Sequence, residues 1–232
     1  MPITVHSEAD ANAVASAAAR FLAEAIGSRI AAAGICTIAL AGGASPLPLY
    51  HRLRGEEHGI DWGRVRIVQT DDVLTKDIEA RSTSRIAAAL NLAELYGEAL
   101  ADHWYPIPHD VIDPATSYQD TLARLTATGG PDIAVLGLGI DGHTAGVFAH
   151  HLTDPPTSTV ALTSYHGQAR ITLTATYLRS APVRMLLALG VSKNDALRAL
   201  LQPDPATPIP ATVVLGADGH VFADSAALEK GF

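Results

Sequence analysis

The sequence has 232 residues, which is long enough to bury a large core as one α/β domain spanning residues 1–232 without disulfides or metals. Hydrophobic residues make up 48% of the chain and charged residues 17%, a composition that suits helices packed around a buried sheet and disfavours disorder. The formal net charge of -8 and the lack of a stretch dense in Lys and Arg disfavour nucleic acid as a partner.

The beginning of the chain carries neither a membrane nor an export signal. Residues 1–10 contain neither a basic nor an apolar region, and no apolar run approaches the ~18 residues that span a membrane. Cys36 is the single cysteine and lies in an apolar run, so we expect a small buried side chain without a redox role. These features predict a cytoplasmic protein without membrane contact.

The first predicted elements are a helix, a strand and a second helix. Apolar residues recur at helical spacing over residues 10–33, and Gly34 is a typical helix stop. Residues 35–41 form a continuous apolar run, which indicates a buried strand. That strand ends in the glycine-rich loop 42–45, after which a helical pattern resumes at Pro48.

Strands and helices continue to alternate toward the C-terminus. Apolar strands that alternate with helices are typical of a parallel sheet covered on both faces. We therefore expect a three-layer, Rossmann-like α/β domain with a mostly parallel central sheet. The proline-containing stretches 154–156 and 202–210 are interpreted as stiff loops within it. The further strands are predicted near 65–70, 104–106, 132–137, 159–163, 169–174, 184–189 and 211–215, and the further helices over 82–95, 116–126 and 193–201.

In such sheets ligands bind at the carboxyl ends of the strands, so the loops that follow strands are the candidate site. The first of these loops consists of Gly42, Gly43, Ala44 and Ser45. Its glycines allow close approach to a ligand, Ser45 can cap the following helix, and free N–H groups at a helix start favour an oxyanion such as phosphate. Taken alone, however, the pattern fits a plain connection better than a binding loop.

The second loop begins with two adjacent carboxylates, Asp71 and Asp72, directly after the strand predicted near 65–70. Such a pair is costly unless it is hydrated, hydrogen-bonded or paired with a cation. One of the two can orient a sugar hydroxyl or cap the next loop. A solvated turn with an Asp cap explains the pair equally well.

The third loop, GLGIDGHTAG over residues 137–146, is the most informative stretch. Its glycines flank Asp141 and His143 just past a buried strand, which favours a tightly packed loop that turns His143 toward a pocket. An imidazole there can take a proton from water and return it to a leaving oxygen. The two alternatives, a satisfied core histidine and a metal ligand, are less favoured. A metal site would combine Asp141 and His143 with His150 and His151, but the spacing fits no familiar ligand motif and the last two are expected on a loop surface.

Two cations follow later in the chain. Lys193 opens a predicted helix, where its charge opposes the helix macrodipole unless an anion lies nearby, so Lys193 is a candidate for binding phosphate. Arg170 precedes the β-like run ITLT and is equally consistent with a surface cation beside a strand.

Several blocks of the chain resemble the 6-phosphogluconolactonase family in their order and spacing, over nearly the whole length. The block DGHTA after GLG is specific to this family and to its relatives, the glucosamine-6-phosphate deaminases. The resemblance implies a sugar-phosphate isomerase-like fold and hydrolysis of 6-phosphogluconolactone to 6-phosphogluconate, a step of the pentose phosphate pathway, without metal or cofactor. The blocks are LAGGASPLPLY, PDIAVLGLGIDGHTAGVF, ARITLTATYL, ALGVSKNDALRAL and PIPATVVLGADGHVFADSAAL.

Carried over by position, the resemblance implies that Asp141 and His143 are the catalytic pair, with His143 activating water. It implies further that the loop 42–45 lies on the phosphate side of the substrate, with Ala44 where a Ser or Thr is usual. Arg170 and Lys193 match the basic positions of the family.

One departure from the family pattern concerns the substrate's anionic group. The Asp-Glu-Arg block of the family falls on residues 71–73, so Val73 stands where the resemblance predicts an arginine, and Ser82-Thr83 stand where Ser-Asn is usual. Either the substrate differs or another cation substitutes. The candidate cations are Lys76, Arg81 and Arg85.

Two rival functions remain open at the level of sequence. The deaminases carry an acidic residue a few positions after the histidine, and residues 144–149 contain none, with Phe148 among them, which favours lactone hydrolysis. A sugar-phosphate sensor without catalytic activity is the second rival, although the DNA-reading helix pair expected of such regulators does not precede the first predicted helix. In every case we expect a small sugar phosphate as the partner, while the oligomeric state is left open.

Overall fold

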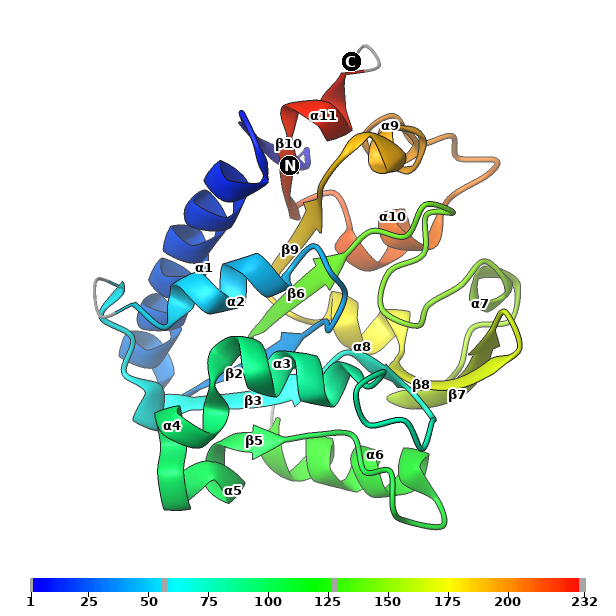
Figure 1. Ribbon diagram of the computed structural model, residues 1–232. Helices are drawn as coiled ribbons and strands as arrows, with labels where there is room; N and C mark the ends of the chain where they lie inside the picture. The colour runs from blue at the N-terminus through cyan, green and yellow to red at the C-terminus, as the bar shows by residue number, and fades with distance from the viewer. Residues whose placement is uncertain (1, 56–57, 127–128, 230–232) are drawn as a thin grey trace.

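The chain forms a large parallel sheet and a small antiparallel sheet, and the computed structural model describes residues 2–55, 58–126 and 129–229 (Figure 1). The strands are β1 (Thr4–Glu8), β2 (Cys36–Leu40), β3 (Val65–Gln69), β4 (Asp71–Val73), β5 (Trp104–Tyr105), β6 (Ile133–Gly137), β7 (Val160–Tyr165), β8 (Gln168–Leu173), β9 (Val183–Ala188) and β10 (His220–Asp224).

Helices of very different length connect these strands, from the long α1 to single turns. The α-helices are α1 (Ala11–Ala33), α2 (Leu47–Leu53), α3 (Ser82–Leu90), α4 (Leu92–Tyr96), α5 (Leu100–His103), α6 (Pro114–Leu125), α7 (His150–Thr153), α8 (Ala175–Arg179), α9 (Asn194–Leu201), α10 (Pro210–Leu215) and α11 (Ser225–Leu228). Short 3₁₀ turns are η2 (Trp62–Arg64), η3 (Gly97–Ala99) and η4 (Val191–Lys193). No helix within the described ranges is both long and apolar enough to cross a membrane.

The main sheet has the strand order β1-β10-β9-β6-β2-β3-β5, and every neighbouring pair is parallel. Alternate residues of a strand point to opposite faces, so Ile133 and Val135 of β6 pack in one core while Ala134 and Leu136 pack in the other. The first core is closed by α1, α2 and α3, and the second by α6, α8, α9 and α10 (Figure 1). The expected three-layer α/β architecture with a mostly parallel sheet is therefore confirmed.

The small sheet branches from the end of β3 and consists of β4, β8 and β7 in antiparallel order. The backbone N–H of Thr70 donates to Leu40 of β2, and the carbonyl of Thr70 accepts from Leu173 of β8, so Thr70 joins the two sheets. The strands expected near 159–163 and 169–174 thus exist, but they form a hairpin outside the main sheet. This hairpin places β8 beside the carboxyl end of β3.

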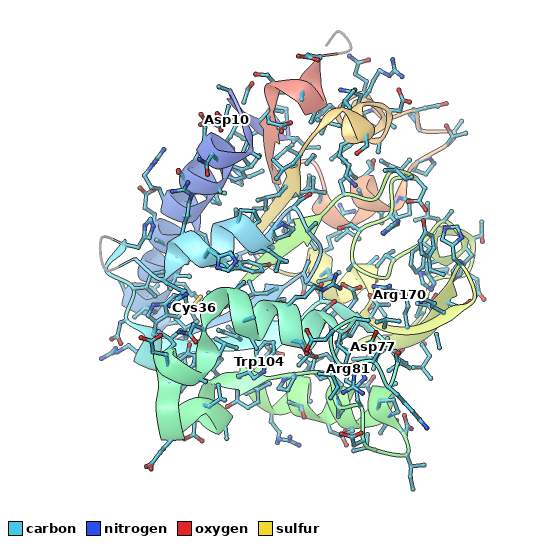
Figure 2. All side chains as sticks on the ribbon, in the orientation of Figure 1. Asp10, Cys36, Asp77, Arg81, Trp104 and Arg170 are labelled. Carbon is cyan, nitrogen blue, oxygen red and sulfur yellow. The ribbon has the colours of Figure 1, made fainter. Side chains whose placement is uncertain are left out.

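The helix expected over 10–33 is present with both of its end signals. The side chain of Asp10 (Figure 2) accepts hydrogen bonds from the N–H groups of Asn12 and Ala13, and Gly34 ends the helix in the left-handed conformation at φ 80°. The helix expected over 82–95 is divided at Asn91, whose φ of 49° interrupts the right-handed pattern.

The strand predicted for 211–215 is wrong, because these residues belong to the helix α10. Short apolar runs do not distinguish a buried strand from a buried helix, whereas Pro210 at the first helical position is a helix signal. The real C-terminal strand is β10, which starts nine residues after the predicted start at 211 and pairs with β1 and β9. Neither β1 nor β10 is marked by a continuous apolar run.

Candidate functional site

The loops that follow four adjacent strands of the main sheet, β9, β6, β2 and β3, line a cavity of about 540 Å³. Because the strands are parallel, their carboxyl ends lie at one edge, and residues distant in the sequence meet there. Of the residues singled out in the sequence, the lining includes Gly43, Ala44, Ser45, Asp71, His143, Arg170 and Lys193. Gly42 and Asp141 are not part of the lining, but each contacts a residue that is: Gly42 lies against Ser82, and Asp141 pairs with His143.

The loop after β2 brings its backbone close to the start of α3. A Cβ atom on Gly42 would lie 2.3 Å from the Cβ of Ser82, so this position has no room for a side chain. The expected helix cap by Ser45 is wrong, because α2 begins after Pro46 without any side-chain cap. The Ser45 hydroxyl has no hydrogen-bond partner among the described residues and lines the cavity, where it can contact a ligand.

The two adjacent aspartates after β3 take different partners. Asp71 is 5% exposed, and its Oδ2 lies 2.5 Å from an Nη of Arg170 (labelled in Figure 2), so it is neither a solvated turn nor a cap. Asp72 is fully buried and accepts hydrogen bonds from the backbone N–H groups of Ser82 and Thr83. Thus Asp72 caps α3, while Asp71 and Arg170 form an ion pair at the cavity.

The pKa of Asp72 reflects this capping role. Burial raises the pKa of the carboxyl group, but hydrogen bonds from Ser82, Thr83 and the N–H of Val73 outweigh burial and hold the pKa below its usual value. The carboxylate therefore stays charged while buried, and it ties the first turn of α3 to β4.

The loop after β6 places the imidazole of His143 directly against backbone. A Cβ on Gly139 would lie 2.1 Å from the Nδ1 of His143, and the Gly139 N–H donates to the His143 carbonyl at 2.8 Å. Gly142 adopts φ 82°, a conformation that L side chains rarely adopt. The glycines thus serve to seat His143 at the cavity, as their pattern in the sequence predicts.

The Nδ1 of His143 and the Oδ1 of Asp141 are 2.5 Å apart. Partial burial raises the pKa of Asp141, but the hydrogen bonds and the charge interaction with His143 outweigh it, and the pKa is lowered. An ionised Asp141 keeps the proton of His143 on Nδ1, because a carboxylate can only accept. The other ring nitrogen, Nε2, then carries a free lone pair and has no hydrogen-bond partner among the described residues.

Two aromatic residues that the sequence does not single out as part of the catalytic group complete the surroundings of His143. The hydroxyl of Tyr165 on β7 donates to Asp141 Oδ2 at 3.2 Å. Phe148 stacks on the Tyr165 ring with centroids 4.6 Å apart and contacts His143 at 5.0 Å. These contacts depend on the register of the small sheet, and no local sequence motif indicates them.

Lys193 approaches the same cavity from the end of β9. It forms the last residue of η4 and precedes α9, as the sequence predicts for a helix start. Burial lowers its pKa, while the negative charge of Asp141 partly offsets this effect. No described carboxylate lies within ion-pair distance of its ammonium group. A partly desolvated, unpaired cation is well suited to bind an anionic ligand.

The two histidines that follow the loop 137–146 lie in different surroundings. His151 is 9% exposed and accepts a hydrogen bond from the Phe148 N–H, so the expected surface position is wrong for His151, whereas His150 is exposed. Within the described part of the chain, no three His, Cys, Asp or Glu side chains converge in a way that could hold a metal ion.

A second, larger cavity of about 880 Å³ lies between the beginning of β1 and the ends of α9 and α10. Its lining is mainly apolar, with Arg179 as a charged residue and without any carboxylate or imidazole. Acid–base chemistry therefore points to the smaller cavity around His143 as the functional site.

Comparisons with known proteins identify the family of the chain. A family model described as glucosamine-6-phosphate isomerases/6-phosphogluconolactonase matches residues 9–223. The 6-phosphogluconolactonase of Mycobacterium leprae is 27% identical over 94% of both chains, and that of Synechocystis is 31% identical over 75% of both chains. The family model spans most of the sequence, including the loops around the cavity.

Solved structures share the fold. A 6-phosphogluconolactonase from Thermotoga maritima superposes with a TM-score of 0.81 at 22% identity, covering 96% of this chain and 99% of that one. A monomeric glucosamine-6-phosphate deaminase superposes with a TM-score of 0.74 at 19% identity, covering 98% and 99%. The fold alone therefore does not distinguish hydrolysis from deamination, and residues in the cavity must do so.

Proposed function

Since this chain belongs to the glucosamine-6-phosphate isomerase/6-phosphogluconolactonase family, we propose that it hydrolyses 6-phosphogluconolactone to 6-phosphogluconate. The observation that carries the proposal is the pairing of His143 with Asp141 at the cavity. This pairing leaves Nε2 without a described partner on a side chain that lines a cavity of about 540 Å³. Water activation is the chemistry that such a nitrogen supports best.

The proposed reaction begins when Nε2 of His143 takes a proton from water and the water oxygen attacks the lactone carbonyl carbon. The carbonyl electrons move to oxygen and give a tetrahedral oxyanion. When the oxyanion collapses, the bond from the carbonyl carbon to the ring oxygen breaks, and Nε2 returns its proton to that oxygen. Asp141 stabilises the imidazolium that exists between the two proton transfers.

The phosphate of the substrate is proposed to bind opposite His143, against the loop 42–45 and Lys193. Gly43 and Ala44 offer backbone close to the cavity, Ser45 offers a free hydroxyl, and Lys193 offers an unpaired charge. Arg170 differs from Lys193 because Asp71 already neutralises its charge. We assign the ion pair of Asp71 and Arg170 to orienting the sugar part of the substrate.

The side chain at position 148 disfavours deamination as the function. Phe148 stands among the residues after His143 where an acid is expected for amine chemistry, and its ring packs on Tyr165 with an interplanar angle of 4°. An apolar ring there cannot exchange protons with an amine or a ring oxygen. The neighbourhood of His143 therefore supports hydrolysis.

The experiment that tests the proposal compares freshly generated 6-phosphogluconolactone with unphosphorylated gluconolactone in a coupled assay. We expect hydrolysis of the phosphorylated lactone well above its spontaneous rate, and a much smaller kcat/KM for the other. A sugar-phosphate sensor would bind the compound and leave the spontaneous rate unchanged. Ammonia release from glucosamine 6-phosphate would indicate a deaminase instead.

A further inference from the structure

The replacement of an expected arginine by Val73 leaves a gap in the positive charge around the cavity. Val73 on β4 lies directly opposite Arg170 on β8, so both side chains share one face of the small sheet. Arg170 is already paired with Asp71 on that face. The small sheet therefore presents no unpaired cation to a phosphate.

The three cations near this gap differ in where the structure places them. Arg81 (labelled in Figure 2) donates through Nε and an Nη to the carbonyl of Thr75, at 3.0 and 2.7 Å, which ties it to its own loop. Lys76 is exposed and does not line the cavity. Arg85 does line the cavity, together with Ser82 from the same turn of α3.

The position of Arg85 is fixed by the contact between α3 and β4. Asp72 accepts from the N–H of Ser82 at 2.7 Å and from the hydroxyl of Thr83 at 2.8 Å. Asp72 and Val73 are neighbours on β4. The strand that lacks the expected arginine therefore also holds α3, the helix that carries Arg85. The cation therefore lies on the helix that is attached to β4 and not on β4 itself.

The charge of Arg85 has no partner among the described residues. No carboxylate lies within ion-pair distance, and its guanidinium makes one long hydrogen bond of 3.4 Å to the carbonyl of Ala80. Arg85 also lies in the first turn of α3, where no acidic residue is present and a cation opposes the helix macrodipole. An anion in the cavity would pair with the charge of Arg85 and offset its unfavourable interaction with the helix macrodipole. A guanidinium can also donate two parallel hydrogen bonds to two oxygens of one phosphate.

We propose that Arg85 binds the phosphate group of the substrate and takes the role of the arginine that Val73 replaces. The inference rests on the proposed function for the identity of the substrate, though not for the binding of phosphate itself. Arg85 and Lys193 then hold the phosphate between them, from α3 and from the end of β9. Recognition of the phosphate would in this way depend on a helix instead of a strand.

The test uses Arg85→Ala, with Arg85→Lys as the charge-retaining variant and Lys76→Ala as the matched control outside the cavity. Loss of a charge-assisted hydrogen bond predicts a KM for 6-phosphogluconolactone that rises about 10- to 100-fold in Arg85→Ala, with kcat nearly unchanged. Arg85→Lys recovers part of the loss. Lys76→Ala and the activity toward unphosphorylated gluconolactone stay at the wild-type level.

Binding of inorganic phosphate, measured by calorimetry, separates this inference from the proposed function. Weaker phosphate binding by Arg85→Ala, at an unchanged thermal midpoint, supports the inference whether or not the wild type is a lactonase. Equal phosphate affinity and equal KM in Arg85→Ala and wild type would overturn it while the proposed function stands. A wild type that leaves the lactone at its spontaneous rate would overturn only the proposed function.

Discussion

A chain of hydrogen bonds from Tyr165 through Asp141 to His143 determines how the proposed base is held. The carboxylate of Asp141 has two oxygens, and it uses one for His143 and the other for Tyr165. Burial and the charge of Asp141 raise the pKa of Tyr165, so its hydroxyl keeps the proton it donates. Tyr165 is therefore a positioning residue, which fixes the carboxylate that in turn fixes His143.

Replacing Tyr165 by Phe removes this hydrogen bond and leaves the stacking on Phe148 in place. The lost hydrogen bond contributes about 1 kcal/mol to holding Asp141 and His143 in place, so we expect kcat to fall about fivefold with KM unchanged. Tyr105→Phe is the matched control, because its hydroxyl donates to the carbonyl of Asp102 away from the cavity. Steady-state kinetics of both variants check the prediction. A rise in KM with constant kcat would instead place Tyr165 in substrate binding.

The residues of the site were predictable to the extent that local sequence marks them. The glycines around Asp141 and His143 mark a strained, tightly packed loop, and Lys193 marks a helix start. Tyr165 carries no such mark, because its contact with Asp141 arises only when the β7–β8 hairpin folds beside the loop 137–146. The cap expected from Ser45 fails because Pro46, and not Ser45, occupies the position before the first residue of α2.

Among the elements, α3 depends most visibly on a single buried group. The carboxylate of Asp72 caps the helix from a neighbouring strand, with further contacts to Gln69 and to His109 at 3.2 Å. A cap that comes from another element, instead of from the preceding residue, couples the helix to the small sheet. The arrangement of the cavity wall that carries Ser82 and Arg85 follows from this coupling.

Asp72→Ala leaves buried N–H groups at the start of α3 without a partner, and we expect it to lower the free energy of unfolding by about 2–4 kcal/mol. Urea denaturation measures the effect. Asp113→Ala, which removes the exposed cap of α6, is the matched control and is expected to cost less. Equal losses in the two variants would contradict the capping role of Asp72.

The lowered pKa of Asp72 gives this prediction a pH dependence. Because the folded state holds the carboxylate in its charged form, the contribution is fully present above the unfolded-state pKa of about 4. It disappears as the pH falls through the depressed pKa of the folded state. The stability difference between wild type and Asp72→Ala should therefore shrink in acid, and a difference that is constant down to pH 2 would contradict this explanation.

At the scale of the whole molecule, the alternation of apolar strands and helices predicts the layered parallel sheet, because a strand buried on both faces has few polar residues. The ends of the chain are harder to predict. β1 is an exposed edge strand with a mixed sequence, and its partner β10 is recognisable only once the two ends meet. The prediction over 211–215 fails because burial alone does not distinguish strand from helix.

Because β2 is an interior strand of the main sheet, Cys36 is a probe of global unfolding. Cys36 (labelled in Figure 2) is fully buried, and burial, with a smaller contribution from the charge of Asp132, raises the pKa of its thiol to about 12. We expect the folded protein to resist a thiol reagent at pH 8 and to react in the same urea range in which circular dichroism is lost. Rapid labelling of the folded protein would show that the main sheet opens locally.

The central claim, that His143 activates water, is tested most directly by the kcat of His143→Ala on freshly generated 6-phosphogluconolactone. We predict a fall of about 10²- to 10⁴-fold after subtraction of the spontaneous rate, at unchanged affinity for inorganic phosphate, because the base is lost while the phosphate side of the cavity is intact. A kcat close to that of the wild type would contradict it.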